Sequence, residues 1–255
     1  MTRPVFIGDE LSVTFDQLDQ GDVATLGGAE GHHAAAVKRI QPGEYLDVVN
    51  GCGVRLLCDV VGVSKNTVTV RVQERRVEEA PAQRLILVQA LAKGGRDEQA
   101  IAQATEIGVD QVIPWMASRC EVHWRGPKVE RGASKWQASV QNAAKQARRA
   151  FIPTVGEPRD STRLTEWITE FVASGGSCLL CHEEAVHPLS TFLRDHLPTG
   201  DIAVVVGPEG GVSPEEVDSF QGAGATTVLL GPHVLRSASA GPAALTLVSA
   251  AVGRW

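Results

Sequence analysis

Apolar residues are spaced in one way in the first third of the chain and in another way in the rest. Up to about residue 73, short segments rich in Val and Leu alternate partly with polar residues and are bounded by turn sequences, which predicts short β-strands. The segments are "EYLDVVN", "VRLLCDVVGV" and "TVTVRVQ", and a helical segment, "GAEGHHAAAVKRI", precedes them. We therefore predict a small β-barrel domain over residues 1–73 and interpret the charged stretch "QERRVEEAPAQ", residues 73–83, as a linker.

From about residue 83 to residue 255, strand-like and helix-like segments alternate. The apolar runs "LILVQAL", "QVIPW", "CLLC", "IAVVV" and "TTVLL" have the length of buried strands. In the helical segment "DEQAIAQATEIG", Ala100, Ile101, Ala104 and Ile107 share one face, and Gly108 supplies a stop. The other predicted helices are "SKWQASVQNAAKQARRA", "TRLTEWITEFVAS", "PEEVDSFQGAG" and "AALTLVSAAVGRW". This alternation predicts an α/β domain with a parallel sheet covered on both faces.

Composition and charge narrow the function classes. The chain has 255 residues, of which 43% are hydrophobic, and a formal net charge of −6. An acidic chain has no global attraction to nucleic acid, so an RNA-binding surface must be a local patch. The N-terminus lacks the apolar core of a signal peptide, and no apolar run is long enough to span a bilayer. We therefore expect a cytoplasmic protein without a membrane segment.

The cysteine and histidine patterns predict no metal site. The five cysteines are odd in number and irregularly spaced, which is typical of reduced thiols in a cytosol. Cys178 and Cys181 form a C-x-x-C, but they lie in an apolar segment that reads as a buried strand. His182, His187 and His233 show no ligand spacing. We expect structural thiols and no bound metal.

The stretch "VVVGPEGGVSPEE" joins a predicted strand to a predicted helix through a glycine-rich turn. Ser213 to Glu216 forms a strong helix start, with a capping box and Pro214 at the first helical position. The turn Gly207–Gly211 therefore lies at the carboxyl edge of the sheet, where ligands of open parallel sheets bind. It contains no G-x-G-x-x-G or G-K-S/T, and Glu209 would repel a pyrophosphate. The turn suits a nucleoside without phosphate that is read by backbone groups; a plain tight turn is the alternative.

A second segment, "VLLGPHVLRSASAGPAAL", residues 228–245, repeats the order of strand, Gly-Pro turn, loop and helix. Two neighbouring strands that each end in a Gly-Pro turn would give one pocket two backbone walls. Within the loop, only His233 and Arg236 have polar side chains long enough to reach a ligand. An arginine at a ligand pocket can fix an anion or a polarised oxygen with its fork of donors; a surface arginine is the alternative.

These two Gly-Pro motifs together resemble the signature motifs of RsmE, the family of 16S ribosomal RNA uridine-N3 methyltransferases in the SPOUT superfamily. The resemblance covers nearly the whole chain. It includes "LAKGGRDEQAIAQATEIGVDQVIPWMASRC", "KWQASVQNAAKQARRAFIP" and "HHAAAVKRIQPGEYLDVVNG". The resemblance implies an N-terminal PUA-like β-barrel that binds RNA and a C-terminal SPOUT-type parallel sheet with a trefoil knot. It also implies a homodimer that uses S-adenosylmethionine to methylate 16S rRNA of the small ribosomal subunit.

Carried onto this chain, the resemblance assigns the cofactor to the two Gly-Pro loops and to a third loop after "CLLC". The implied cofactor-binding residues are His182, Glu183, Val206, Gly207, Pro208, Glu209, Gly210, Gly211, Leu230, Gly231, Pro232, Val234, Leu235, Arg236, Ser237 and Ala240. The chain departs from the family at three places. Many members have Arg at the position of His233, Thr-Glu-Thr at Ser237–Ser239, and Glu at Lys145. The second departure leaves Ala238 without a carboxylate that could act as a base.

For catalysis we single out Arg236, which could stabilise the uracil anion or bind the phosphate of the target nucleotide. No general base is identifiable. Because N3 is hidden in a base-paired helix, we expect single-stranded or distorted RNA as substrate. The candidate phosphate contacts are Arg3, Lys38, Arg39, Arg96, Arg119, Arg148 and Arg149. Two alternatives stay open, a SPOUT enzyme that methylates ribose 2′-oxygen or another base, and a non-catalytic RNA-binding protein; the missing G-x-G-x-x-G disfavours a dinucleotide oxidoreductase.

Overall fold

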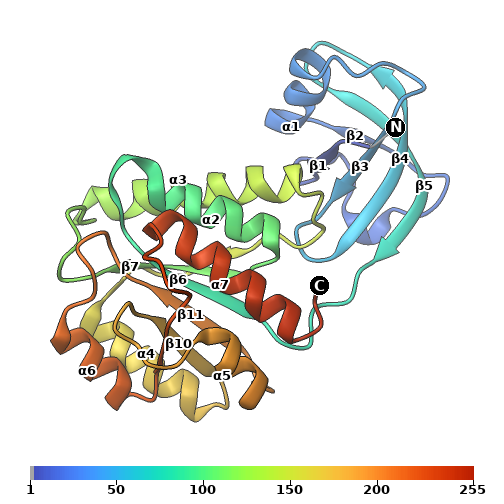
Figure 1. The fold of residues 1–255 in the computed structure, drawn as a ribbon. Coiled ribbons are helices and arrows are strands. Elements are labelled where there is room, and N and C mark those ends of the chain that lie inside the picture. Colours follow the sequence, from blue (N-terminus) through green and yellow to red (C-terminus); the bar gives the residue numbers. More distant parts are fainter. Residues whose placement is uncertain (1–2) are drawn as a thin grey trace. The chain divides into compact units, whose positions relative to one another are not determined.

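The computed structural model describes residues 3–255, and the chain divides into two compact units. The first unit holds residues up to 80 together with residues 144–152, and the second holds residues 81–143 and 153–255 (Figure 1). The segment 144–152, which includes the end of one long helix, thus groups with the first unit.

The first unit is built on a five-stranded sheet with the strand order β1-β3-β4-β5-β2. β1 pairs in parallel with β3, and the other neighbours are antiparallel. A short helix, α1 (Gly28–His32), continues into a π-helical turn, η2 (His33–Val37), as the sequence predicted for this segment. The strands are β1 (Val5–Ile7), β2 (Val23–Leu26), β3 (Tyr45–Val49), β4 (Val54–Val63) and β5 (Val68–Val77), and a 3-10 turn, η1, spans Phe15–Gln17. The core is fully apolar and includes Phe6, Leu26, Leu46, Val48, Leu56 and Val70.

The last strand of this unit is longer than predicted. Gln73 to Val77 were interpreted as the start of a linker, but they continue β5 and pair with β4, with Val77 opposite Val54. The prediction was wrong because the stretch is rich in arginine and glutamate and lacks the apolar residues by which strands are recognised in a sequence. A strand with a solvent-facing side is held by backbone hydrogen bonds to its neighbour and does not need apolar side chains on that side.

The second unit is an α/β domain whose sheet has the order β12-β10-β11-β6-β7-β8, with β9 also paired to β7, and every pairing is parallel. The central strands β6 (Leu85–Ala90) and β11 (Ile202–Val206) are buried at every residue, which explains their unbroken apolar sequences. The remaining strands are β7 (Gln111–Met116), β8 (Thr154–Val155), β9 (Arg159–Asp160), β10 (Ser177–Cys181) and β12 (Thr226–Val228).

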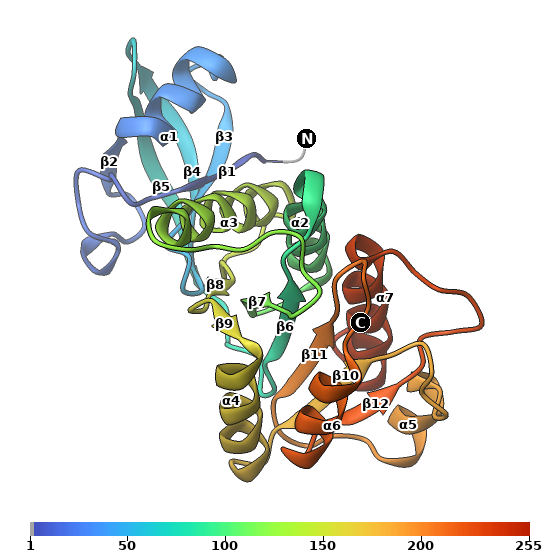
Figure 2. The same cartoon turned by 90° about the vertical axis from the view of Figure 1, so that its left-hand side faces the viewer.

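Helices cover both faces of this sheet, with α2 and α7 on one side and α4 and α6 on the other (Figures 1 and 2). In α2, Ala100, Ile101 and Ala104 are buried and Gly108 caps the helix with a left-handed φ of 115°, as the sequence predicted. The structure also contains a helix that the sequence analysis did not identify, α5. The helices are α2 (Arg96–Ile107), α3 (Pro127–Gln146), α4 (Ser161–Ala173), α5 (Leu189–Asp195), α6 (Pro214–Gly222) and α7 (Ser237–Ala251), and a 3-10 turn, η3, spans Lys93–Gly95.

The closing helix begins earlier than predicted. The sequence suggested a start at Ala243, because a Gly-Pro pair normally interrupts a helix. α7 instead begins at Ser237 and contains Pro242. The small residues of its first turns let the helix approach the sheet closely: a Cβ at Gly241 would lie 2.9 Å from Cδ1 of buried Leu87. The burial of this segment outweighs the interruption at Pro242.

Two further expectations bear on the chemistry of the domain. All five cysteines are free, and Cys178 lies buried in β10 as predicted. Across residues 3–255, no helix combines the length and the apolar character needed to cross a membrane. The trefoil knot itself stays a prediction of the resemblance.

Candidate functional site

The loops that follow β10, β11, β12 and β6 meet at one edge of the sheet, because parallel strands present their carboxyl ends together. The three segments predicted to bind a cofactor are the loops after β10, β11 and β12. The structure therefore brings together His182 and Glu183, the turn Gly207–Gly211, and the loop that ends at Arg236.

The first glycine loop is a tight turn between β11 and α6. The N–H of Gly211 donates to the carbonyl of Pro208 at 2.9 Å, and Gly211 adopts a φ of 75° that favours glycine. A Cβ at Gly207 would lie only 2.6 Å from Cγ2 of Val212. The loop then enters α6 through the capping box of Ser213 and Glu216, as the sequence predicted.

Two arginines, one at the start of α2 and one in the loop after β7, hold this turn. Nη1 of Arg96 lies 3.0 Å from Oε1 of Glu209, and Nη1 of Arg119 donates to the carbonyl of Gly210 at 3.3 Å. The ion pair partly offsets the negative charge that Glu209 brings to the loop. Arg96 and Arg119 were selected as phosphate contacts, and the structure places both against the first glycine loop; their contact with RNA stays a prediction.

Glu216 is the polar centre that ties this edge of the domain together. Its carboxylate is buried and accepts hydrogen bonds from the N–H of Ser118 at 2.7 Å, the hydroxyl of Ser161 at 2.5 Å and the N–H of Ser213 at 3.0 Å. Burial acts to raise the pKa of Glu216, but these hydrogen bonds outweigh it and hold the pKa below its ordinary value of 4.5. Glu216 thereby joins the loop after β7 and the first turns of α4 and α6.

The second Gly-Pro loop crosses the ends of the central strands. β12 lies at the edge of the sheet, whereas Ser237, at the start of α7, accepts a hydrogen bond from Nε2 of Gln89 in β6 at 2.8 Å. Residues 229–236 must therefore pass the ends of β10 and β11, a span of about 14 Å at the usual strand spacing. The segment can stretch to about 27 Å, so it has slack, and Figure 2 shows it bowing outward in red-orange before α7.

The third loop is joined to the second by backbone hydrogen bonds. The N–H of His182 donates to the carbonyl of Val228 at 3.0 Å, and the N–H of Leu229 donates to the carbonyl of His187 at 2.9 Å. Nδ1 of His182 accepts from the N–H of Glu184 at 3.2 Å, which fixes the imidazole within its own loop. These bonds hold the loops after β10 and β12 side by side.

The side chains of the second loop face outward. Arg236 is exposed, and among residues 3–255 its guanidinium has no hydrogen bond or ion pair. Val234 and Leu235 are 78% and 41% exposed, which is high for apolar side chains beside a candidate ligand site. Ala238, by contrast, is buried in the first turn of α7. The position that carries Glu in many members of the resembling family is thus enclosed here.

The other predicted RNA contacts belong to the first unit. Arg3 lies 3.7 Å from Asp47 and over the ring of Tyr45, so it has intramolecular partners. Lys38 and Arg39 are exposed after η2, and both Arg39 and Arg148 have a φ of 55°. Arg149 belongs to the same unit. Lys145, the third departure from the resembling family, lies 2.6 Å from Glu30.

Sequence reasoning missed Gln89, Ser118 and Ser161 as residues of this edge. Gln89 is fully buried and carries a signal that could have revealed it, because it is the only polar residue in the apolar run "LILVQAL". Ser118 and Ser161 carry no such signal, since serine in a loop or at a helix start is common.

The cysteines near the site do not supply a nucleophile. Burial raises the pKa of Cys178 and Cys181 to about 12 and that of Cys120 to about 11, so these thiols stay protonated at neutral pH. Among residues 3–255, no three His, Cys, Asp or Glu side chains cluster in a way that could hold a metal ion. These thiols are therefore not the reactive groups of this edge.

Two family models match the chain, the RNA methyltransferase domain over residues 78–249 and the RNA methyltransferase PUA domain over residues 26–73. Among curated relatives, ribosomal RNA small subunit methyltransferase E of Mycobacterium bovis is 40% identical over 237 residues, which cover 93% of this chain and 90% of the relative.

Solved structures agree with this match. A protein from Legionella pneumophila, solved with bound cofactor SAM, superposes with a TM-score of 0.83 at 27% identity, with 98% of each chain covered. A ribosomal RNA small subunit methyltransferase E from Neisseria gonorrhoeae superposes with a TM-score of 0.84 over 98% of each chain; at 23% identity it shows the fold alone.

The Glu216 network predicts a pH-dependent loss of stability on substitution. We expect Glu216→Gln to lower the free energy of unfolding by roughly 2–3 kcal/mol at pH 7, because an amide nitrogen would face backbone donors in a buried site. The depressed pKa means that the carboxylate stabilises the fold above pH 4.5, its ordinary pKa, and that this contribution is lost as pH falls through the folded-state pKa. Denaturant unfolding from pH 7 to pH 3.5 measures both effects.

The difference between wild type and Glu216→Gln should therefore be constant above about pH 5 and shrink below it. Glu166→Gln, at an exposed position of α4, is the matched control and should change stability little at any pH. An equal difference at every pH, or a variant as stable as the wild type at pH 7, would contradict the role assigned to Glu216.

Proposed function

Because the chain belongs to the family of ribosomal RNA small subunit methyltransferases E, we propose that it transfers the methyl group of S-adenosylmethionine to N3 of a specific uridine in 16S ribosomal RNA. The observation that carries the proposal is the meeting of three loops at the carboxyl edge of the sheet, with Arg236 exposed beside them. A ribosomal RNA substrate also argues for a cytoplasmic site of action.

The residues at this edge fit the proposed cofactor. Glycines in the first loop open the backbone to close approach, and no lysine or P-loop sequence is present to bind a triphosphate. Val234 and Leu235 offer apolar surface for an adenine ring. Glu209, although paired with Arg96, keeps a carboxylate beside the loop that suits a positively charged ligand better than a phosphate.

The proposed cofactor supplies, when bound, a methyl group on a positively charged sulfur that is already activated for transfer. The protein's task is to hold the uracil ring in line and to exclude water, and positioning of this kind can supply much of the rate. As the N3 proton leaves to solvent, negative charge spreads to the neighbouring carbonyl oxygens. Arg236 can donate hydrogen bonds to one of these oxygens, or to the phosphate of the target nucleotide, because its guanidinium has no intramolecular partner among residues 3–255.

The departures at His233 and Ala238 bear on this mechanism. Ala238 is buried and carries no carboxylate that could act as a base. Ser239, next to it, is exposed, and Ser237 is held by Gln89. The proposal therefore places the chemical role on Arg236 and assigns proton removal to solvent.

We propose that the first unit binds the RNA and that the chain acts as a homodimer. The basic residues Lys38, Arg39 and Arg148 of the first unit are exposed and suit phosphate contacts. The apolar side chains that remain exposed on and after α7, Leu247 at 38% and Trp255 at 66%, suit contact with a second copy of the chain.

The first glycine loop predicts how cofactor binding can be blocked. A Cβ at Gly210 would lie 3.2 Å from both Cβ and the carbonyl oxygen of Arg119, so Gly210→Val must displace the turn or the loop after β7. We expect the variant to stay folded and to lose far more than 10-fold in affinity for S-adenosylmethionine, where 10-fold corresponds to about 1.4 kcal/mol. Calorimetry measures the affinity. Gly222→Ala, which meets no atom within 4 Å, is the control and should bind normally; an unchanged affinity in folded Gly210→Val would refute the assignment.

Arg236→Ala separates catalysis from cofactor binding. We expect cofactor affinity to stay nearly intact and methyl transfer to fall roughly 100- to 1,000-fold, because a charge-stabilising donor is lost. Arg39→Ala should instead weaken RNA binding and flatten its salt dependence. The assay transfers labelled methyl to unmodified small-subunit RNA and identifies the methylated nucleoside after digestion.

Three results would contradict this part of the proposal. A wild-type rate in Arg236→Ala would remove the catalytic role of that residue. A 2′-O-methyl nucleoside in place of 3-methyluridine would favour methylation of ribose. RNA binding by the wild type without any methyl transfer would favour a non-catalytic RNA-binding protein.

The dimer proposal predicts a monomeric variant. Light scattering of the wild type at micromolar concentration should give twice the mass of the chain. Leu247→Glu should shift the protein towards monomer, because a charge at an apolar interface is costly to bury, whereas Leu197→Glu, 52% exposed in the loop after α5, should remain dimeric. A monomeric wild type would reject the proposal.

A further inference from the structure

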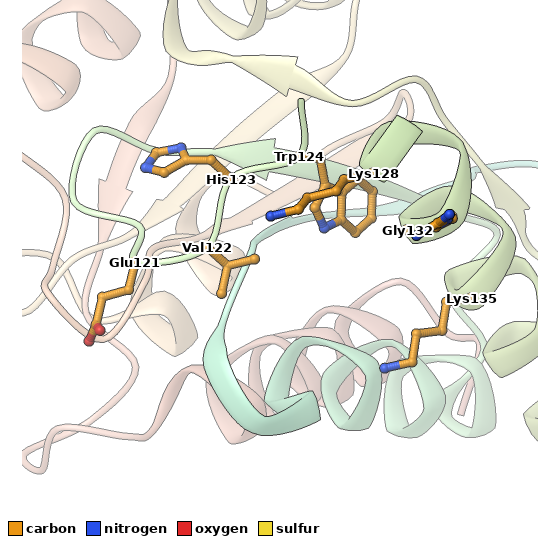
Figure 3. A pocket seen from close by; sticks show the side chains of 8 residues that line it. Glu121, Val122, His123, Trp124, Lys128, Gly132 and Lys135 are labelled. Carbon is orange, nitrogen blue, oxygen red and sulfur yellow. The ribbon is translucent and has the colours of Figure 1, made fainter. Parts of the chain in front are cut away.

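A pocket of about 410 Å³ lies outside the three-loop site, between the loop after β7 and the first turns of α3. Its lining combines basic, aromatic and apolar side chains (Figure 3). Figure 3 shows Lys128 crossing in front of Trp124 and Lys135 extending from α3 below it, with Val122 on the opposite side and the His123 ring pointing outward from the loop. The lining residues are Glu121, Val122, His123, Trp124, Lys128, Arg131, Gly132 and Lys135.

The aromatic base of the pocket is held firmly in place. Trp124 packs edge-on against Trp136, with 5.7 Å between the ring centroids, and Nε1 of Trp136 donates to buried Asp97 at 3.3 Å. α3 carries Gly132 where the indole of Trp124 crosses it, and a Cβ at this position would overlap the ring. Gly132 therefore lets the tryptophan lie directly on the helix, where Trp124 is buried and only 9% exposed.

The pocket is positive in a protein that is negative overall. Residues 117–135 contain five Lys and Arg and two Glu, a net charge of +3, whereas the whole chain carries −6. Two of the cations beside the pocket are partnered, Lys135 by Glu98 and Lys93 by Glu121. Lys128 and Arg131 are exposed and form no ion pair with any residue in the described part of the chain. The pocket thus has two cations available for an anionic ligand.

The pocket is also connected to the three-loop site by a short stretch of chain. Arg119 contacts the first glycine loop through Gly210, and His123 lies four residues further on, at most about 14 Å away. A ligand that extends from the three-loop site past Arg119 would reach the pocket within a short distance. A single strand of RNA is such a ligand, because it carries a phosphate at every nucleotide.

We propose that this pocket binds a nucleotide that flanks the target uridine, with its phosphate on Lys128 and Arg131 and its sugar beside Val122 and the exposed edge of Trp124. The proposal rests on the proposed function, since it names a subsite for the same RNA. A positively charged groove that contacts the phosphates binds single-stranded nucleic acid without reading its sequence. The pocket would hold the strand in register while the target base enters the three-loop site.

The test compares three double variants of the full chain. The test variant, Lys128→Ala with Arg131→Ala, removes the two unpaired cations of the pocket. A first control, Lys128→Arg with Arg131→Lys, keeps their charge. A second control, Arg163→Ala with Arg194→Ala, removes two exposed cations from α4 and α5. The probe is a single-stranded oligonucleotide of unmodified small-subunit ribosomal RNA. Its affinity is measured over a range of salt concentrations, and the affinity for S-adenosylmethionine is measured in parallel.

We expect the double Ala variant at the pocket to bind the oligonucleotide roughly 10-fold more weakly and to lower the magnitude of the salt slope by about 0.7, because one phosphate contact on a single strand contributes about 0.7. Its cofactor affinity should be unchanged. The charge-keeping variant should retain most of the slope, and the variant on α4 and α5 should match the wild type.

The outcomes separate this proposal from the proposed function. If the wild type binds both cofactor and RNA but the pocket variant matches the variant on α4 and α5, the subsite alone is overturned. If the wild type binds neither ligand, the proposed function fails and the subsite fails with it. Uridine 5′-monophosphate tests the source of the phosphate: competition only at millimolar concentration supports a strand-binding subsite, whereas binding as tight as the oligonucleotide's would overturn it in favour of a mononucleotide site.

Discussion

The last helix must return from the edge of the sheet to its centre, and the candidate site depends on that return. β12 closes one edge, whereas α7 packs against β6 and β11 and is anchored by the hydrogen bond from Gln89 to Ser237. Residues 229–236 therefore cross the ends of the intervening strands and form one wall of the site. Arg236 is the last residue of that crossing, so its position is set by the anchoring of the residue beside it.

The opposite wall is fixed by polar contacts from several elements. Arg96 and Arg119 hold the first glycine loop, and Glu216 joins the start of α6 to Ser118 and Ser161. None of these groups needs to touch a ligand to matter. A turn whose backbone is read directly by a ligand must keep its geometry, and contacts from neighbouring loops restrict its movement more than the turn sequence could by itself.

Charge is distributed so that an acidic protein can bind RNA locally. Many of its basic side chains are partnered, as Lys145 is by Glu30 and Lys135 by Glu98. Among the proposed RNA contacts, Lys38 and Arg39 in the first unit and Lys128 and Arg131 beside Trp124 in the second are exposed. A local excess of unpaired cations attracts phosphate, while the net negative charge limits binding to unrelated nucleic acid.

The sequence by itself determined the two-part organisation, the parallel sheet and the two Gly-Pro turns, because apolar periodicity and turn residues reflect local backbone preferences. It also predicted the capping box of Ser213 and Glu216. It misjudged the end of β5 and the start of α7, where strand pairing to β4 and close packing on Leu87 override local signals. Only the tertiary structure showed that Glu216 has partners beyond its own helix, that Arg119 lies on Gly210, and that Trp124, Lys128 and Arg131 share a pocket. These contacts join residues that are distant in the chain or lie on different elements, and no pattern of neighbouring residues encodes them.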